Sequence, residues 1–121
     1  MSYRIIDKAI GTLITTTITP SIVLSYTLPS DCSAIIDAVI IARNTTTGDC
    51  TGSRKIFTAK NVAGAASVFA SGTNLFSNQG DISLVATTNT VNSLGANIQV
   101  QVTGLALTTI EWMAALTIYI N

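Results

Sequence analysis

The sequence of 121 residues contains no histidine and only six acidic and six basic side chains. A catalytic dyad or triad that uses histidine is therefore excluded, and acid–base chemistry would fall on six carboxylates that are scattered along the chain. Metal binding has as little support, because the two cysteines are distant and no aspartate-rich loop has calcium-site spacing. The sequence predicts no catalytic, cofactor-binding or metal-binding residue, and hence a protein that is not an enzyme.

Long apolar runs and net charge are also missing. Every apolar run is broken within a few positions, whereas a membrane-spanning helix needs about 18 or more consecutive apolar residues. A formal net charge of zero gives no long-range attraction for phosphate backbones or anionic lipid. Residues 1–10 contain Arg4, Asp7 and Lys8 and lack the pattern of a signal peptide. We therefore expect neither nucleic acid nor a membrane as a partner, and synthesis in a cytoplasm.

The sequence has two cysteines, Cys32 and Cys50, on either side of the apolar segment 33–44. If that segment is one strand, its rise of about 3.3 Å per residue holds the two cysteines farther apart than the roughly 7 Å between Cα atoms that a disulfide allows. The spacing predicts two free thiols.

The sequence is rich in segments that alternate apolar and polar residues, a pattern typical of half-buried strands. Turn-forming residues separate them at intervals of roughly 8–12 residues, and no convincing amphipathic helix is present. These features predict an all-β fold, an antiparallel β-sandwich or jelly roll of about eight strands in one domain, residues 1–121. The expected strands are residues 12–19, 22–28, 33–44, 54–62, 65–70, 81–88, 98–103 and 110–120.

Two of these segments carry most of the large apolar residues. Residues 33–44 also fit helical spacing, but their isoleucine and valine content favours a strand packed on both faces. Residues 110–120 place one apolar residue at every second position, which predicts a long central strand. Trp112 shares that apolar face, so we expect it in the core rather than stacked on a sugar.

Two polar features resemble functional sites. The loop 44–52 contains glycine and threonine, as phosphate-binding loops do, but Gly52 leads into Ser53, Arg54 and a strand, so we expect a hairpin loop. Asp37 lies between apolar neighbours, and burial would raise its pKa. We favour the simpler interpretation that it points outward or pairs with Arg43 or Arg54.

The outward strand positions carry Thr, Val, Ala and Ser where a solvated sheet would carry Lys and Glu. A neutral and weakly polar surface promotes association, so the composition predicts a protein that assembles with copies of itself or with a partner. Residues 1–10 are expected to act as an N-terminal docking arm. The candidate interface residues are Arg4, Asp7, Lys8, Arg54, Lys55 and Tyr119.

Three stretches of the sequence resemble a module of small virion proteins of tailed bacteriophages. They are the C-terminal stretch that runs from Gly95 through NIQVQVTG (97–104) to TTIEW (108–112), the central KNVAG (60–64), and RNTTTGD (43–49). The resemblance implies a β-sandwich or jelly-roll virion component, usually oligomeric and commonly trimeric, and does not imply catalysis.

The resemblance covers proteins of several places in the virion. With no coiled-coil or fibre extension in the sequence, we expect a capsid cement or decoration protein on the capsid exterior, bound where subunits of the major capsid protein meet. The alternative is a tail, neck or fibre module that attaches to host glycans through exposed aromatic residues, with Tyr3, Tyr26 and Tyr119 as candidates.

Overall fold

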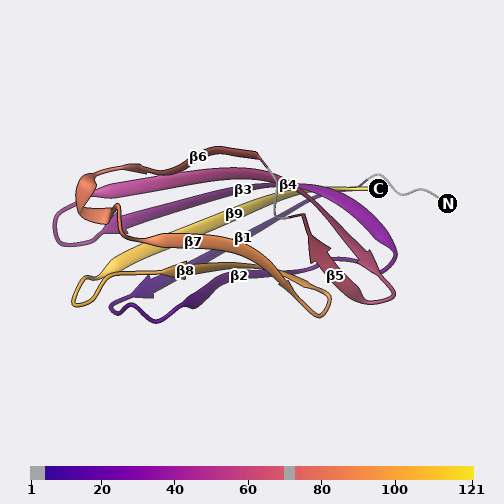
Figure 1. The fold of residues 1–121 in the computed structure, drawn as a ribbon, viewed down its shortest axis with the longest axis horizontal. Helices are drawn as coiled ribbons and strands as arrows, with labels where there is room; N and C mark the ends of the chain where they lie inside the picture. The colour runs from indigo at the N-terminus through magenta and orange to yellow at the C-terminus, as the bar shows by residue number, and fades with distance from the viewer. Residues whose placement is uncertain (1–4, 70–72) are drawn as a thin grey trace.

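The computed structural model describes residues 5–69 and 73–121, and these are mostly β-strands (Figure 1). The described strand pairs are antiparallel, which confirms the predicted all-β antiparallel fold, with nine strands in this part of the chain in place of about eight. The elements are β1 (Ile5–Thr15), β2 (Ser21–Thr27), β3 (Cys32–Asn44), β4 (Cys50–Val62), β5 (Ala65–Val68), β6 (Thr73–Gly80), the 3-10 helix η1 (Ile82–Leu84), β7 (Thr88–Leu94), β8 (Asn97–Thr103) and β9 (Ile110–Ile120).

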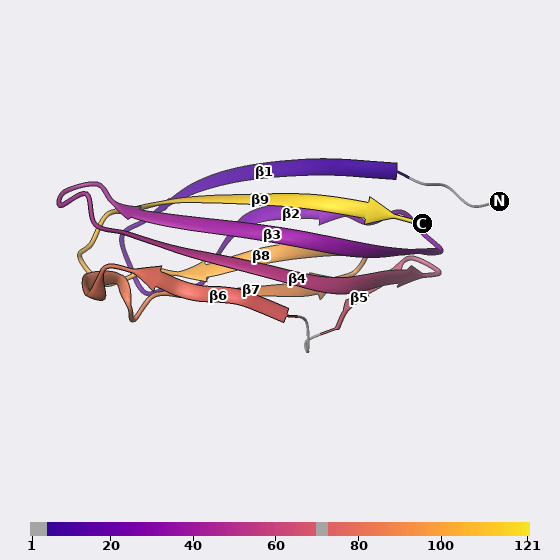
Figure 2. The same ribbon diagram turned by 90° about the horizontal axis from the view of Figure 1, so that it is seen from above.

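The strands form two sheets. The larger sheet has the order β1-β9-β3-β4-β5. β5 pairs with the C-terminal end of β4, and β6 pairs with the N-terminal half of the same edge of β4. The smaller sheet has the order β2-β8-β7. Figure 2 shows β1, β9, β3 and β4 side by side in the larger sheet. Neighbours such as β1 and β9 come from opposite ends of the sequence, so non-local pairing sets the architecture.

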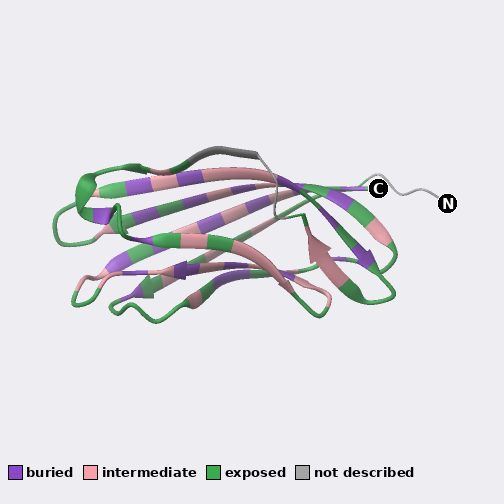
Figure 3. Cartoon of the chain, in the orientation of Figure 1, coloured by how far each residue is buried: buried purple, intermediate pink, exposed green. Residues whose placement is uncertain are grey.

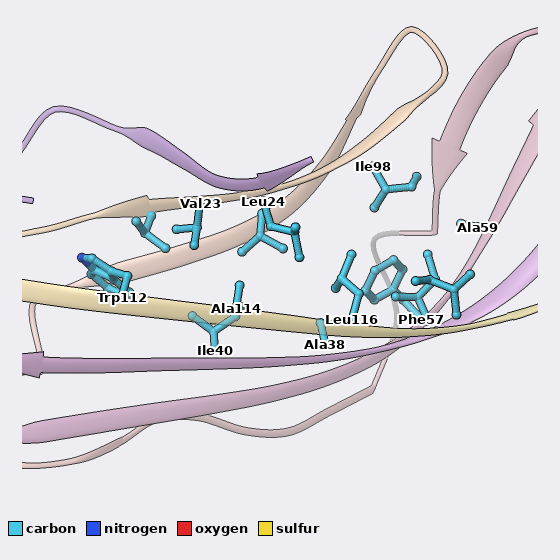
Figure 4. Packing of buried hydrophobic residues seen from close by; sticks show 14 of the residues in the cluster. Val23, Leu24, Ala38, Ile40, Phe57, Ala59, Ile98, Trp112, Ala114 and Leu116 are labelled. Atoms are coloured by element: carbon cyan, nitrogen blue, oxygen red, sulfur yellow. The ribbon is translucent and has the colours of Figure 1, made fainter. Parts of the chain in front are cut away.

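The hydrophobic core lies between the two sheets. Strands β3 and β9 bury every second residue along most of their length, which gives the alternating bands of Figure 3. In Figure 4 the side chains of Phe57, Trp112 and Leu116 on the larger sheet point toward the smaller sheet, which contributes Val23 and Leu24. The prediction that residues 110–120 form a long central strand is confirmed, because β9 pairs with β1 on one side and β3 on the other.

The single tryptophan of the chain is part of this core. Trp112 is 1% exposed, and its indole Nε1 donates a hydrogen bond of 2.9 Å to the Oγ1 of the buried Thr15 on β1. This bond satisfies a donor that would be costly to bury alone. The expectation that Trp112 is a core residue is confirmed.

Strands β3 and β4 form a hairpin, as the interpretation of residues 44–52 required. The loop is shorter than expected, because β4 begins at Cys50. The side-chain oxygen of Asn44 accepts hydrogen bonds from the backbone N–H groups of Thr46 and Thr47, at 2.9 and 3.2 Å. Gly48 has a φ of +80°, a conformation that favours glycine. The loop is therefore organised by its own backbone contacts.

The two cysteines are free thiols, as predicted. Cys32 is the first residue of β3 and lies opposite Asn61, whereas Cys50 is the first residue of β4 and lies opposite Arg43. They therefore stand at opposite ends of the same hairpin. Burial, followed by the charge of Asp31, raises the pKa of the Cys32 thiol.

The strand expected at residues 81–88 is wrong, since η1 occupies its first half. Leu84 is fully buried while Ile82 and Val85 are exposed, which fits a tight turn that inserts one apolar side chain into the core. The Oγ1 of Thr87 donates a hydrogen bond of 2.7 Å to the carbonyl oxygen of Leu84 and closes this turn.

No helix in the described part of the chain is long and apolar enough to cross a membrane.

Strands β6 and β7 were not predicted. β6 begins and ends in the turn-forming residues 72–74 and 78–80, and β7 has the largely polar sequence TNTVNSL. Neither strand has the regular apolar alternation that identifies the others. Their pairing with β4 and β8 holds them in place.

The first strand begins earlier and ends earlier than the expected residues 12–19. Of the segment 1–10, which was predicted to be a docking arm, residues 1–4 lie outside the described part of the chain. Residues 5–10 form the first half of β1 and pair with β9. Docking by this segment stays a prediction.

Residues 33–44 form strand β3, as predicted, but the expectation that both faces are packed is corrected. Ile36 and Ile40 are buried between the sheets, whereas Ile35 and Ile41 are 52% and 42% exposed on the opposite face. The reason is that the smaller sheet covers one side of β3. Nothing in the described part of the chain covers the other side to the same extent.

Candidate functional site

The outer face of the larger sheet carries many exposed apolar side chains. Because the register of β1, β9 and β3 aligns residues directly across the sheet, outward side chains form rows that cross three strands. We call this surface the isoleucine face. Its apolar rows are Ile6–Tyr119–Ile35 and Ile10–Ala115–Val39, and the polar row Lys8–Thr117–Asp37 lies between them. The next row, Thr12–Met113–Ile41, is mixed, and Ile14 lies beyond it.

An ion pair lies within the isoleucine face. The Nε and Nη2 atoms of Arg54 on β4 donate hydrogen bonds of 3.0 and 2.6 Å to the two carboxylate oxygens of Asp37 on β3. This hydrogen bonding holds the pKa of Asp37 below its usual value, against the opposing effect of burial. The interpretation of Asp37 as an outward residue paired with an arginine is confirmed.

An open groove of about 570 Å³ lies at the end of the isoleucine face where β1 begins and β9 ends. The side chains of Ile6, Ile35 and Tyr119 line it, together with the polar Thr58 and Asn121. With few polar groups on its walls, the groove suits an apolar or aromatic side chain better than a charged ligand.

The outer face of the smaller sheet has a different chemistry. Strands β2, β7 and β8 contain no charged residue, and their outward positions alternate with the buried Ile98, Val100 and Val102. Hydroxyl and carboxamide groups fill most of these positions. We call this surface the amide face, and its polar residues are Ser25, Thr27, Thr88, Thr90, Asn92, Asn97, Gln99, Gln101 and Thr103.

Side chains of the amide face bond to one another across strands. The Oγ1 of Thr27 donates a hydrogen bond of 2.7 Å to the Oδ1 of Asn97, and the Nδ2 of Asn92 donates one of 3.3 Å to the Oε1 of Gln101. Carboxamides offer both donors and acceptors, and hydroxyl groups do the same. A flat surface of this kind can exchange hydrogen bonds with another uncharged, hydroxyl-rich molecule.

Three of the six candidate interface residues share the isoleucine face. Lys8 lies opposite Thr117 in β9, and Arg54 lies opposite Val39 in β3. Tyr119 lies between Ile6 and Ile35, in the row nearest the groove. Lys8 and Tyr119 are exposed. The structure thus brings together residues from three separate strands.

The other candidate interface residues do not lie on the isoleucine face. Arg4 is outside the described residues. The carboxylate of Asp7 points to the other side of β1 and accepts a hydrogen bond of 2.9 Å from the Tyr26 hydroxyl. The Nζ of Lys55 donates a hydrogen bond of 2.9 Å to the carbonyl oxygen of Asn89, and burial lowers the pKa of this lysine. Lys55 therefore links the two sheets rather than contacting solvent freely.

The aromatic residues considered for glycan binding are in unlike positions. Tyr3 lies outside the described residues, and Tyr119 is exposed beside the groove. Tyr26 is half-buried, and burial together with the hydrogen bond to Asp7 raises its pKa to about 12. Of the two described tyrosines, Tyr119 is the one whose ring is available to a ligand.

Two carboxylates that are distant in sequence lie near the same end of the molecule. The Oδ2 of Asp49 accepts a hydrogen bond of 2.6 Å from the hydroxyl of Ser83, and the Oδ2 of Asp81 accepts one of 2.9 Å from the backbone N–H of Cys50. The contact between the β3–β4 loop and η1 joins segments that are distant in sequence and was not predicted. In the described ranges, no three His, Cys, Asp or Glu residues gather closely enough to hold a metal ion.

No protein-family model matches the chain, and no curated protein matches its sequence. Among solved structures, the chain is similar to the tailspike protein gp49 of Acinetobacter baumannii bacteriophage Fri1, a capsular polysaccharide depolymerase, with a TM-score of 0.51 and 10% identity over 93% of this chain. The tailspike protein of Acinetobacter baumannii phage AM24 has a TM-score of 0.44 and 13% identity over 94% of this chain. The chain spans 17% of the first protein and 26% of the second.

At this identity the likeness to the Fri1 tailspike shows a shared fold. The β-rich fold expected from the resemblance to phage virion proteins is thus found as part of a phage tailspike. The comparison also corrects the expectation that the chain is not an enzyme, because the same fold occurs within a depolymerase. A β-sandwich with no histidine is therefore no ground for excluding catalysis.

Proposed function

We propose that this chain is a structural module of a phage tail attachment protein, in which the amide face contacts polysaccharide on the host surface. The observation that carries the proposal is the fold, which spans 93% of this chain and matches part of a phage tailspike. The expected capsid cement function has no comparable support. The tail alternative is therefore preferred.

The chemistry of the amide face supports this role. Sugars present many hydroxyl groups and no strong charge in their neutral forms, so they are bound by side chains that donate and accept at once. Gln99 and Gln101 alternate with buried residues on β8, the middle strand of the smaller sheet, which holds their amides on a rigid element. A rigid strand positions polar groups better than a mobile loop does.

The proposal is tested with the purified full chain on an array of bacterial capsular polysaccharides and O-antigens. We expect binding to at least one polysaccharide, and a loss of about 10-fold in affinity when Gln99→Ala and Gln101→Ala are combined, because hydrogen bonds of this kind contribute about 0.5–1.5 kcal/mol each. Gln79→Ala is the matched control, since Gln79 is exposed on β6 and distant from the amide face. Release of reducing ends is measured in the same samples to detect cleavage.

The competing function is tested on the same preparation. The protein is mixed with empty, expanded capsids of the phage that encodes it, and with purified tails, and each particle is pelleted. Binding to a polysaccharide with sensitivity to the double substitution supports the proposal. Binding to capsids without any polysaccharide binding would contradict it and restore the cement function.

A further inference from the structure

We propose that the isoleucine face binds further copies of this chain and that this face is the surface through which the protein assembles. The proposal is independent of the glycan-binding role, which is placed on the opposite outer surface. It assigns a location to the self-association that the composition predicts. The partner to which it commits is the same face of another copy, a two-fold contact that closes as a dimer and not as the trimer that the resemblance implies.

The first argument is the sequence of the strands themselves. Strand β3 has large apolar residues on both faces, which is the pattern of a strand covered from both sides. The smaller sheet covers only the inner side, and outward Ile35 and Ile41 remain exposed. A half-solvated antiparallel sheet would normally alternate apolar with polar residues. The outward residues therefore fit a surface that is buried in the assembled protein.

The second argument is area. Strands of 11 residues at about 3.3 Å per residue, with four strands about 4.8 Å apart, give a face of roughly 700 Å² across β1, β9, β3 and β4. This is close to the roughly 800 Å² per partner of a standard specific interface.

The third argument is charge. Asp37 and Arg54 neutralise each other in a two-bond ion pair, so on this face β3 and β4 carry no unpaired charge between the rows of Ile35 and Ile41. Lys8 lies toward one end of the face and Glu111 toward the other, beside Arg43. A second copy laid antiparallel on the first brings Lys8 of one chain toward the neighbouring Glu111 and Arg43 of the other, and Glu111 is the partner of opposite charge. The face is therefore compatible with itself.

The fourth argument is the contrast between the two outer surfaces. The amide face carries hydroxyl and carboxamide groups that water or a glycan can satisfy, whereas the isoleucine face exposes five isoleucines, Ile6, Ile10, Ile14, Ile35 and Ile41. Packing the isoleucine faces together leaves the amide face of each copy pointing outward. The pair would then present two amide faces, one on each outer side, which increases apparent affinity for a repeating polymer that reaches both.

The test is the mass of the full chain in solution, measured by light scattering and sedimentation over a range of concentrations. We expect twice the chain mass of 12.6 kDa for the wild-type protein. Ile10→Lys, at a position 70% exposed in the single chain, should shift the protein toward the monomer and weaken association at least about 10-fold. Leu94→Lys and Ile82→Lys are matched controls, since these side chains are 67% and 87% exposed outside the isoleucine face. Both controls should keep the wild-type mass.

A second variant guards against loss of folding in a lysine substitution. Ile10→Thr combined with Ile35→Thr keeps β-branched side chains, which strands favour, and removes apolar area from the face. Circular dichroism and the fluorescence of the buried Trp112 confirm the fold of each variant. A wild-type protein that stays monomeric at millimolar concentration, or an oligomer that persists in every folded face variant, would overturn the proposal. Polysaccharide binding by a monomer would leave the proposed function standing while this inference fails.

Discussion

Removing the hydroxyl of Thr15 tests the argument that the buried tryptophan needs its hydrogen-bond partner. The indole Nε1 of Trp112 donates to the Thr15 Oγ1 at 2.9 Å, and both residues are buried. Thr15→Val keeps the shape of the side chain but leaves the indole N–H without a partner. An unsatisfied buried donor costs about 1–3 kcal/mol, so the free energy of unfolding should fall by that amount.

The measurement is urea denaturation followed by far-ultraviolet circular dichroism at one fixed protein concentration, because assembly would make stability depend on concentration. A loss of about 2 kcal/mol lowers the urea midpoint by roughly 1 M at a slope of about 2 kcal/mol per M. Thr15→Ser is the control, because it keeps the hydroxyl and removes one methyl group, at a cost of about 0.8 kcal/mol.

A double-mutant cycle isolates the bond. In the Trp112→Phe protein there is no indole N–H to satisfy, so Thr15→Val should cost at least about 1 kcal/mol less there than in the wild-type protein. Equal costs in the two backgrounds would refute the reasoning, because the effect would then come from packing around Thr15 and not from the hydrogen bond.

Three further predictions concern single groups. Because the pKa of Asp37 is lowered by Arg54, the pair stabilises the fold above the usual aspartate pKa, and the stability difference between wild type and Asp37→Asn should shrink as the pH falls below about 4; a difference independent of pH would contradict this. The Tyr26 phenol, with its pKa raised to about 12, should ionise near that pH in an absorbance titration, and Asp7→Asn should lower the midpoint; stability contributed by this tyrosine is lost as the pH rises toward 12. Gly11→Ala should destabilise the protein by about 1–3 kcal/mol in thermal unfolding, because a Cβ there would meet a backbone carbonyl oxygen of β2; an unchanged midpoint would show that the two strands can separate at no cost.

Local alternation identified the strands whose inner face is strongly apolar. β3, β8 and β9 were located closely, and Trp112 was correctly assigned to the core, because one strand with one buried face carries that information in its own residues. The separation of the thiols of Cys32 and Cys50 followed from the length of a single strand. These features depend on short-range geometry.

Strands β6 and β7 and the turn η1 could not be located in the same way. β7 contributes little apolar area and is held by its pairing with β8, and η1 is fixed by one buried side chain, Leu84. In each case the decisive contacts come from segments distant in sequence. The composition and spacing of residues within a short segment of sequence do not predict such contacts.

The candidate site also combines features that the sequence predicted with features that only contacts between distant segments decided. The residue types of the interface were chosen from the sequence, but only the sheet register placed Lys8 and Tyr119 on one face and Asp7 and Lys55 on the other. The choice of Arg54 rather than Arg43 as the partner of Asp37 was also decided by that register.

The sequence by itself determined that this chain is an antiparallel β protein with a neutral, weakly charged surface, because strand alternation and composition are local and additive properties. Only the tertiary structure decided which strands meet, since β1 pairs with β9 across nearly the whole chain. It also decided that one outer surface gathers the exposed isoleucines and the other is lined by hydroxyl and carboxamide groups. Pairing and register are set by contacts between distant segments, which is why the two faces become visible only in the folded protein.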